Sequence, residues 1–409
     1  MIIIQNAKLI SRGIIRDCDL AVDEQHIKTI GKPGTLVAAY REEHPSSDDQ
    51  LHVIDAEGLY LSHGFIDCHV HGGGGHDYMD GTEEAWFGAG RLHLEYGTTG
   101  IVPTTLSSDG DELLQALAVY EGLKNKPHNG AKILGIHVEG PYLAPSQSGA
   151  QDPAHLRTPD PVEYHKILAA TPDILRWTVA PELEGALEMG AELEKHGIVG
   201  CIGHSDATID EVRDAVLHGF KQTTHLYSAM STITRRDGFR FPGVVESAYL
   251  LDALTSEIIA DGCHLPPDLL EMAYRFIGPD RLCLVTDAMR AAGKTEGESI
   301  LGSLENGQRV ILEDGVAKMP DRTAFAGSIA TADRLVRTMH RETSATLADC
   351  IKMITETPAR AMGLQDQTGT VAVGRLADLI LFDEDINIQM TMLDGDIKYN
   401  SDEFAEKLK

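Results

Sequence analysis

Short apolar runs alternate with amphipathic stretches along the middle of the chain, from about residue 57 to residue 365. The apolar runs include GFIDCHV, GIVPTT, AKILGIHVEG, RWTVAPE, GIVGCIGHS and RLCLVTD, and stretches such as DELLQALAVYEGLK and TIDEVRDAVLHG separate them. Strand-like and helix-like segments that alternate in this way predict a parallel sheet with crossover helices. Roughly eight such units fit a closed (β/α)8 TIM barrel better than an open sheet. We therefore predict an α/β barrel over residues 57–365.

The two ends of the chain have a different pattern. Residues 1–56 carry runs rich in β-branched residues, such as MIIIQNAKLI and QLHVIDAEG, and residues 366–409 are strand-like again in GTVAVGRLADLILFD. Two strand-rich ends around a different middle predict one small β-sandwich domain formed by 1–56 together with 366–409. The polar stretch 38–50 is expected to be a surface loop.

Composition narrows the classes of function. The chain has 35 Lys plus Arg and 63 Asp plus Glu, a formal net charge of −28, which argues against nucleic acid or an anionic membrane as a partner. No stretch reaches the ~18 apolar residues of a membrane span, and the N-terminus lacks the features of a signal peptide, so a cytoplasmic location is expected. The six cysteines show no CxxC spacing and are expected to be reduced, buried thiols.

Polar side chains of one chemical kind end several of the apolar runs. In GFIDCHVHG the two histidines alternate, so both imidazoles are expected to face the mouth of the barrel. The C-terminal ends of barrel strands meet at the face where such folds place their active sites. The residues concerned are His69, His71, Glu139, His204, His225 and Asp287. Imidazoles and carboxylates that converge on one face predict a zinc-type metal site.

Three other histidines flank these segments. His137 precedes Glu139 by two residues and is expected to lie behind the site at most, whereas His63 and His76 flank the HxH pair and could support it. The glycine run 72–75 lacks a following Lys-Ser/Thr, so we interpret it as a flexible turn and not as a phosphate loop.

These motifs carry a resemblance that covers nearly the whole chain. GFIDCHVHG, HVEGPYL, GHSDA, THLYSAM, IADGCH, VTDAM and TPARAMGL occur in the order of the amidohydrolase superfamily, and within it the chain closely resembles the N-acetylglucosamine-6-phosphate deacetylases. HVEGPYL and THLYSAM are distinctive of these deacetylases. The HxH pair and the lone Asp belong to the wider superfamily.

The resemblance implies a role for each ligand-type residue. Glu139, His204 and His225 match the ligands of the constant metal, and Asp287 matches the catalytic acid and base. His69 and His71 match the pair of the two-metal members, so a second metal that shares Glu139 is implied. The expected cofactor is one or two divalent metals per subunit, with zinc first and iron, cobalt or manganese as alternatives.

The resemblance also points to a binding site for a sugar phosphate. The residues implied are Ala150, Gln151, Ser228, Ala229, Arg236, His264, Phe325, Ala326 and Gly327. Gln151 stands where some members have a histidine, and Ser228 replaces a usual asparagine. Arg235, Arg236 and Arg240 are close together, so the choice among them stays open. The family further implies a homodimer in which an arginine reaches the neighbour's pocket.

The expected reaction is metal-dependent hydrolysis of the acetamide of N-acetyl-D-glucosamine 6-phosphate to glucosamine 6-phosphate and acetate, in amino-sugar catabolism. A metal lowers the pKa of its bound water towards ~7, and Asp287 is expected to take the proton and later protonate the departing amine. Gln151 is a candidate donor to the oxyanion. Alternatives left open are the galactosamine epimer, a cyclic-amide hydrolase, a nucleobase deaminase, an N-acyl-amino-acid deacylase and a non-catalytic barrel.

Overall fold

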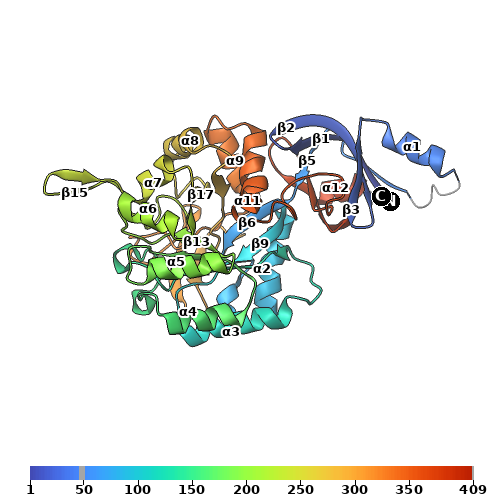
Figure 1. Ribbon diagram of the computed structural model, residues 1–409. Coiled ribbons are helices and arrows are strands. Elements are labelled where there is room, and N and C mark those ends of the chain that lie inside the picture. The colour runs from blue at the N-terminus through green and yellow to red at the C-terminus, as the bar shows by residue number, and fades with distance from the viewer. Residues whose placement is uncertain (46–50, 408–409) are drawn as a thin grey trace.

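The computed structural model describes residues 1–45 and 51–407 of the chain. It has a mixed α/β fold in two parts, which Figure 1 shows side by side. In the larger part helices pack around parallel strands. In the smaller part a sheet holds both ends of the chain.

Two parallel sheets form the centre of the larger part. One has the order β10-β9-β6 and the other the order β11-β12-β13-β14-β17-β18. Their bounds are β6 Phe65–Val70, β9 Thr98–Pro103, β10 Lys132–Ile133, β11 Ile136–Glu139, β12 Ile174–Val179, β13 Val199–Ile202, β14 Phe220–Thr223, β17 Thr255–Ile258 and β18 Leu282–Leu284. Every residue of β6 and β9 is buried, as expected for strands covered on both faces.

Helices follow these strands and cover them from outside (Figure 1). They are α2 Glu83–Glu95, α3 Gly110–Leu123, α4 Pro161–Ala170, α5 Ala186–Lys195, α6 Ile209–Leu217, α7 Val244–Leu250, α8 Pro267–Phe276, α9 Ala332–Glu342, α10 Leu347–Ile354 and α11 Glu356–Ala361. Side chains cap the N-termini of several of these helices. The Asp109 side chain accepts a hydrogen bond from the N–H of Glu112 at the start of α3. Thr208 and Glu211 form a capping box at the start of α6.

The predicted closed barrel is not confirmed, because the hydrogen-bonded ladders form two sheets and not one ring. Isolated bridges between Thr104 and His137 and between Val70 and Ala288 connect the two sheets. The register shifts twice along β6, and β18 has only three residues. At each of the two places where the sheets adjoin, one pair of residues forms a β-bridge.

Strands from both ends of the chain join one sheet in the smaller part. One eight-stranded sheet has the order β24-β23-β22-β5-β1-β2-β3, with β4 beside β1. The strands are β1 Ile2–Ser11, β2 Ile14–Asp23, β3 His26–Gly31, β4 His52–Asp55, β5 Tyr60–His63, β22 Leu379–Phe382, β23 Ile388–Leu393 and β24 Asp396–Asn400. The predicted sandwich is not confirmed, because all eight strands join one sheet. The boundaries at 56 and 366 stay predictions.

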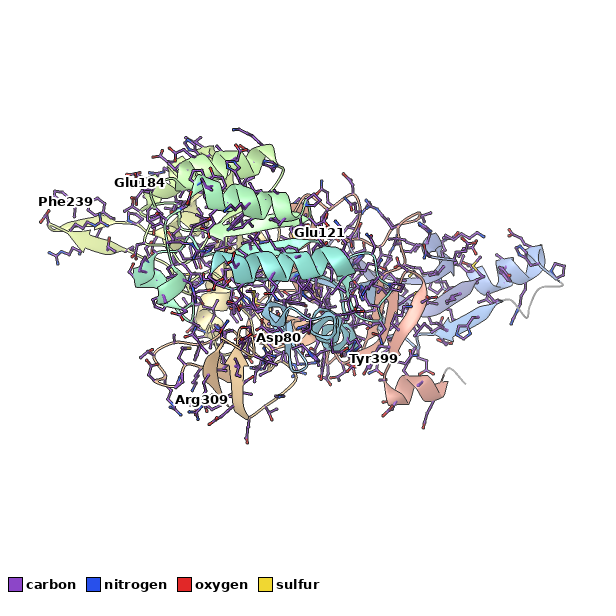
Figure 2. All side chains as sticks on the ribbon, turned by 90° about the horizontal axis from the view of Figure 1, so that it is seen from below. Asp80, Glu121, Glu184, Phe239, Arg309 and Tyr399 are labelled. Atoms are coloured by element: carbon purple, nitrogen blue, oxygen red, sulfur yellow. The ribbon has the colours of Figure 1, made fainter. Side chains whose placement is uncertain are left out.

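Three smaller features complete the fold. A hairpin of β15 Thr234–Arg236 and β16 Phe239–Phe241 projects from the body, with Phe239 at its outer end (Figures 1 and 2). A three-stranded sheet contains β19 Gly297–Leu301, β20 Gln308–Glu313 and β21 Val316–Lys318. The loop expected at 38–50 was wrong for its first part, because α1 spans Leu36–Glu43, and residues 46–50 lie outside the described residues.

Other short elements are β7 Gly72–Gly73, β8 His76–Asp77, α12 Asp402–Lys407 and three single turns of 3-10 helix at Tyr78–Asp80, Pro145–Gln147 and Pro153–His155. All six cysteines are unpaired, and all except the partly exposed Cys263 are buried. In the described ranges 1–45 and 51–407, no helix has the length and apolar character needed to cross a membrane.

Candidate metal centre

Six ligand-type side chains come from five separate strand ends and meet in one place. His69 lies in β6 and His71 just beyond it, Glu139 ends β11, and His204, His225 and Asp287 follow β13, β14 and β18 respectively. All six are buried. The convergence predicted from the sequence is therefore present in the fold, because parallel strands bring their carboxyl ends to one edge.

Glu139 lies at the centre of this group. Its Oε1 atom is 3.1 Å from His225 Nε2 and 3.5 Å from His204 Nε2. The same oxygen is 3.5 Å from His69 Nε2, and Oε2 is 3.2 Å from His71 Nε2. Two sets of potential ligands result, His69-His71-Glu139 and Glu139-His204-His225, and in each the ligand atoms lie within 4.8 Å of one another.

The outer nitrogens of three of these imidazoles are held by acceptors. His204 Nδ1 is 2.8 Å from the Gln147 carbonyl, and His71 Nδ1 is 3.2 Å from the Thr104 carbonyl. His69 Nδ1 is 3.0 Å from Glu257. Because a carbonyl or carboxylate only accepts, each Nδ1 carries a hydrogen, so Nε2 is the nitrogen that each ring, when neutral, offers to a metal.

This donor set fits a divalent metal. His69 Nε2 and His71 Nε2 face each other at 3.3 Å. Neutral imidazoles around a carboxylate are the ligands that zinc and related metals prefer. The residues present are therefore suited to hold the metal that the sequence predicts.

Asp287 lies against the HxH pair. Its Oδ1 atom is 3.4 Å from His69 Nε2 and 3.2 Å from His71 Nε2. Burial acts to raise the pKa of Asp287, but the nearby His69 and His71 outweigh it and lower the pKa to about 2. Burial likewise opposes ionisation of Glu139, and the surrounding histidines hold its pKa well below the usual range. Both groups are carboxylates at neutral pH.

Three of these residues have a backbone conformation in the left-handed region, with positive φ. The φ angles are 50° at His204, 29° at His225 and 46° at Asp287. Residues other than glycine seldom adopt positive φ, and such strain collects at functional sites. At each of these strand ends the turned backbone accompanies a side chain directed into the centre.

A cavity of about 240 Å³ opens beside the ligand group. Most of the residues implied for substrate binding line it: Ala150, Gln151, Ser228, Ala229, His264, Phe325 and Gly327. Gln151 donates to Glu139 Oε2 at 2.7 Å. His264 Nδ1 is 2.9 Å from Asp261, and the His264 ring contacts Phe325 edge-on at 4.9 Å between centroids.

Two of the residues implied for substrate binding, Ala326 and Arg236, do not line the cavity. Ala326 is fully buried in an apolar cluster around Met289 and Leu301, and its N–H donates to the Ala317 carbonyl. Arg236 is exposed on the hairpin, over the Phe241 ring, and does not line the cavity. Arg235 and Arg240 are exposed on the same hairpin.

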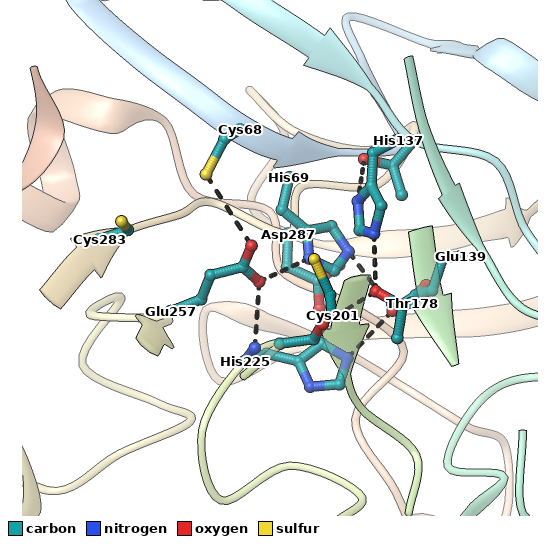
Figure 3. Close-up of polar contacts among 12 residues, drawn as sticks. Cys68, His69, His137, Glu139, Thr178, Cys201, His225, Glu257, Cys283 and Asp287 are labelled. Carbon is teal, nitrogen blue, oxygen red and sulfur yellow. Dashed lines mark hydrogen bonds and ion pairs between the residues drawn. The ribbon is translucent and has the colours of Figure 1, made fainter. Parts of the chain in front are cut away.

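The three histidines that flank the ligand segments, His63, His76 and His137, do not belong to either ligand set. His137 stacks edge-on against His69 and contacts Thr178 Oγ1 at 2.8 Å, so it lies behind the ligands, as expected (Figure 3). His63 does not support the centre, because its ring contacts the Gly64 carbonyl and the Gly369 N–H. His76 is outside both ligand sets.

Several residues at the site were not predicted. Leu106, Gly149, Leu301 and Ala324 also line the cavity. Glu257 and Arg176 form a fully buried ion pair beneath His69. The signal that could have found this pair was a charged residue in each of two strand-like segments, Arg176 at the start of RWTVAPE and Glu257 within LTSEIIADG.

Comparison with known proteins places the chain among close relatives. Residues 60–398 match the family model described as the amidohydrolase family. The chain is 34% identical to the N-acetylglucosamine-6-phosphate deacetylase of Lysinibacillus sphaericus over 90% of this chain and 92% of that protein. It is 31% identical to the deacetylase of that name from Bacillus subtilis, over 95% of this chain and 98% of that protein.

Solved structures agree over the full length. The deacetylase of that name from Pasteurella multocida superposes with a TM-score of 0.87 at 28% identity, covering 97% of this chain and 99% of that chain. A variant of the Mycobacterium smegmatis enzyme in complex with N-acetyl-D-glucosamine-6-phosphate gives a TM-score of 0.86 at 28% identity, covering 98% and 99%.

Proposed function

This chain belongs to the amidohydrolase family, and we propose that it hydrolyses the acetamide of N-acetylglucosamine 6-phosphate to glucosamine 6-phosphate and acetate, in amino-sugar catabolism. The observation that carries the proposal is the group of four histidines around Glu139, with Asp287 beside it, at the wall of the cavity. Relatives at 31–34% identity carry the deacetylase name. The cyclic-amide, nucleobase and galacto alternatives are therefore not favoured.

The two ligand sets would hold the metal. Glu139, His204 and His225 form the first proposed site, and His69 and His71 form the second with Glu139 shared between them. A bound divalent metal lowers the pKa of water and polarises a carbonyl oxygen. Zinc is the first choice, with iron, cobalt or manganese as alternatives.

Asp287 is the proposed carrier of the proton. It is ionised and lies next to the ligand group, so it can accept a proton from the attacking water. It then delivers that proton to the amine nitrogen as the C–N bond breaks. Gln151 lines the same cavity, and one of its amide hydrogens is free of the Glu139 contact to donate to the developing oxyanion.

A sugar phosphate needs positive charge, and among the described residues that line the cavity there is no lysine or arginine. His264 is one of the donors that line it, and Arg236 stands on an exposed hairpin that projects from the body (Figure 2). We place Arg236 in the cavity of a second copy, in a homodimer as the family resemblance implies. A guanidinium holds two phosphate oxygens at once. The closed barrel, the domain boundaries and a cytoplasmic location remain part of this proposal.

The experiment is an acetate-release assay on the zinc-loaded protein. Its substrates are N-acetylglucosamine 6-phosphate, N-acetylgalactosamine 6-phosphate and unphosphorylated N-acetylglucosamine. We expect the highest kcat/KM for the first. Equal values with and without phosphate would refute the phosphate site, and no acetate from any of the three would refute the deacetylase function.

A further inference from the structure

The ion pair beneath the metal centre connects the two ligand sets. Glu257 lies in β17 and Arg176 in β12, and both side chains are 0% exposed. Glu257 Oε2 is 3.0 Å from His69 Nδ1 and accepts the backbone N–H of His225 at 3.1 Å (Figure 3). One carboxylate oxygen therefore contacts a residue of each set.

The other carboxylate oxygen faces Arg176. Nη1 of Arg176 is paired with Glu257 Oε1 and donates to the Cys68 carbonyl at 3.0 Å. Nη2 of Arg176 contacts Cys201 Sγ at 3.3 Å. A guanidinium has donors and no acceptor, so it fixes which groups may stand opposite it. Burying this pair is costly, and such a pair is a weak source of stability.

We infer that Glu257 is a positioning residue that sets the tautomer of His69, and that Arg176 sets the orientation of Glu257. Because the carboxylate accepts from Nδ1–H, a neutral His69 has its lone pair on Nε2, the nitrogen that faces Glu139 and His71. Loss of this contact would leave Nε2 protonated and remove a ligand from the His69-His71-Glu139 set. The inference deepens the proposed function and rests on its two-metal centre.

The chain offers a variant that should invert the tautomer. In Glu257→Gln the shape is kept, but one end of the group becomes a donor. The charged Arg176 outcompetes neutral donors for the amide oxygen, so the amide NH2 turns towards His69 and donates to Nδ1. His69 then carries its hydrogen on Nε2. The second variant, Arg176→Met with Glu257→Gln, removes the competing donor and lets the amide oxygen accept from His69 again.

The test measures tautomer and metal binding, without reference to turnover. Histidine-selective 15N NMR of the full-length protein after metal removal reports which ring nitrogen of His69 carries hydrogen, with the signal assigned through His69→Gln. Titration with Zn²⁺ against a chromophoric chelator gives the affinity of each site. We expect zinc at the His69-His71-Glu139 set to bind about 10- to 100-fold more weakly in Glu257→Gln. The double variant should recover most of that loss.

Three outcomes would overturn the inference. One is an Nε2-protonated His69 in the unaltered protein, which needs no variant and so stands even if Glu257→Gln does not fold. Another is an unchanged tautomer and zinc affinity in Glu257→Gln. The third is a double variant that binds no better than the single one. Failure to release acetate from the sugar phosphate would instead reject the proposed function, and the tautomer result would be unaffected.

Discussion

Asp287 Oδ1 lies 3.2 Å from His71 Nε2, so the proposed proton carrier touches a proposed metal ligand directly. Asp287→Asn keeps the shape but removes the base. We expect about 10³-fold slower acetate release, the scale of a lost general acid and base, with metal content retained. Steady-state kinetics and elemental analysis on the same sample check this. Near-normal turnover would remove Asp287 from the proton-transfer role.

The central place of Glu139 predicts unequal effects of ligand variants. Glu139→Ala should empty both metal sites, because its two oxygens face all four histidines. His204→Ala should empty the first site and His69→Ala the second. Metal counts per chain after zinc loading and desalting test this, with the exposed His165→Asn as control. Loss of all metal in His69→Ala would contradict an independent first site.

The hairpin arginine gives a prediction about the phosphate. Arg236→Ala should lower kcat/KM for N-acetylglucosamine 6-phosphate by roughly 10²-fold, the scale of a lost charge-assisted contact. The slow reaction of the unphosphorylated sugar should scarcely change. Arg235→Ala, on the same strand, is the matched control. An equal loss on both substrates would assign Arg236 to the fold or to the metal centre.

Mixing variants tests whether Arg236 acts across a dimer. On N-acetylglucosamine 6-phosphate, the Arg236→Ala and Asp287→Asn chains are each expected to be strongly impaired. A mixed dimer has one cavity that combines an intact Asp287 with the partner's intact Arg236. We expect activity to reappear on subunit exchange. If Arg236 served its own chain, mixing would restore nothing.

His63 predicts a pH dependence of stability. Burial lowers its pKa below the usual 6.5, so as pH falls below 6.5 the unfolded chain binds the proton first. The contribution of His63 to the free energy of unfolding therefore decreases as the pH is lowered through that window, and it is constant at higher pH. The difference in the free energy of unfolding between wild type and His63→Gln should shrink from pH 8 to 5.5.

Lys132 in the larger part forms ion pairs with the smaller part, and we expect these to contribute to the free energy of unfolding. Its Nζ lies 2.8 Å from the buried Asp378 and 2.6 Å from Asp394. Lys132→Met should cost about 3 kcal/mol of unfolding free energy, because it leaves Asp378 without its cation. Lys398→Met, which breaks an exposed pair with Asp396, should cost below about 1 kcal/mol. Denaturant unfolding compares the two, and equal costs would contradict the argument.

Much of the site was predictable because it depends on local order along the chain. A ligand-type residue that closes an apolar strand must lie at the carboxyl edge of a parallel sheet, and this applied to Glu139, His204 and Asp287. Alternation continued one residue past the end of β6 was enough to place His69 and His71 on one side. The pairing of β5 with β22 was not predicted, because residues 60–63 were assigned to the barrel.

Other features depend on where distant segments meet, which no local pattern contains. That His63 faces Gly369, and that Arg176 meets Glu257 beneath His69, follows from packing between strands far apart in sequence. Ala326 is in the core while its neighbours Phe325 and Gly327 line the cavity, because backbone direction there is fixed by its bond to Ala317. The sequence by itself determined the ligand types and their common edge. The tertiary structure decided which oxygen faces which nitrogen, since those distances come from strand register and from the packing of the two parallel sheets.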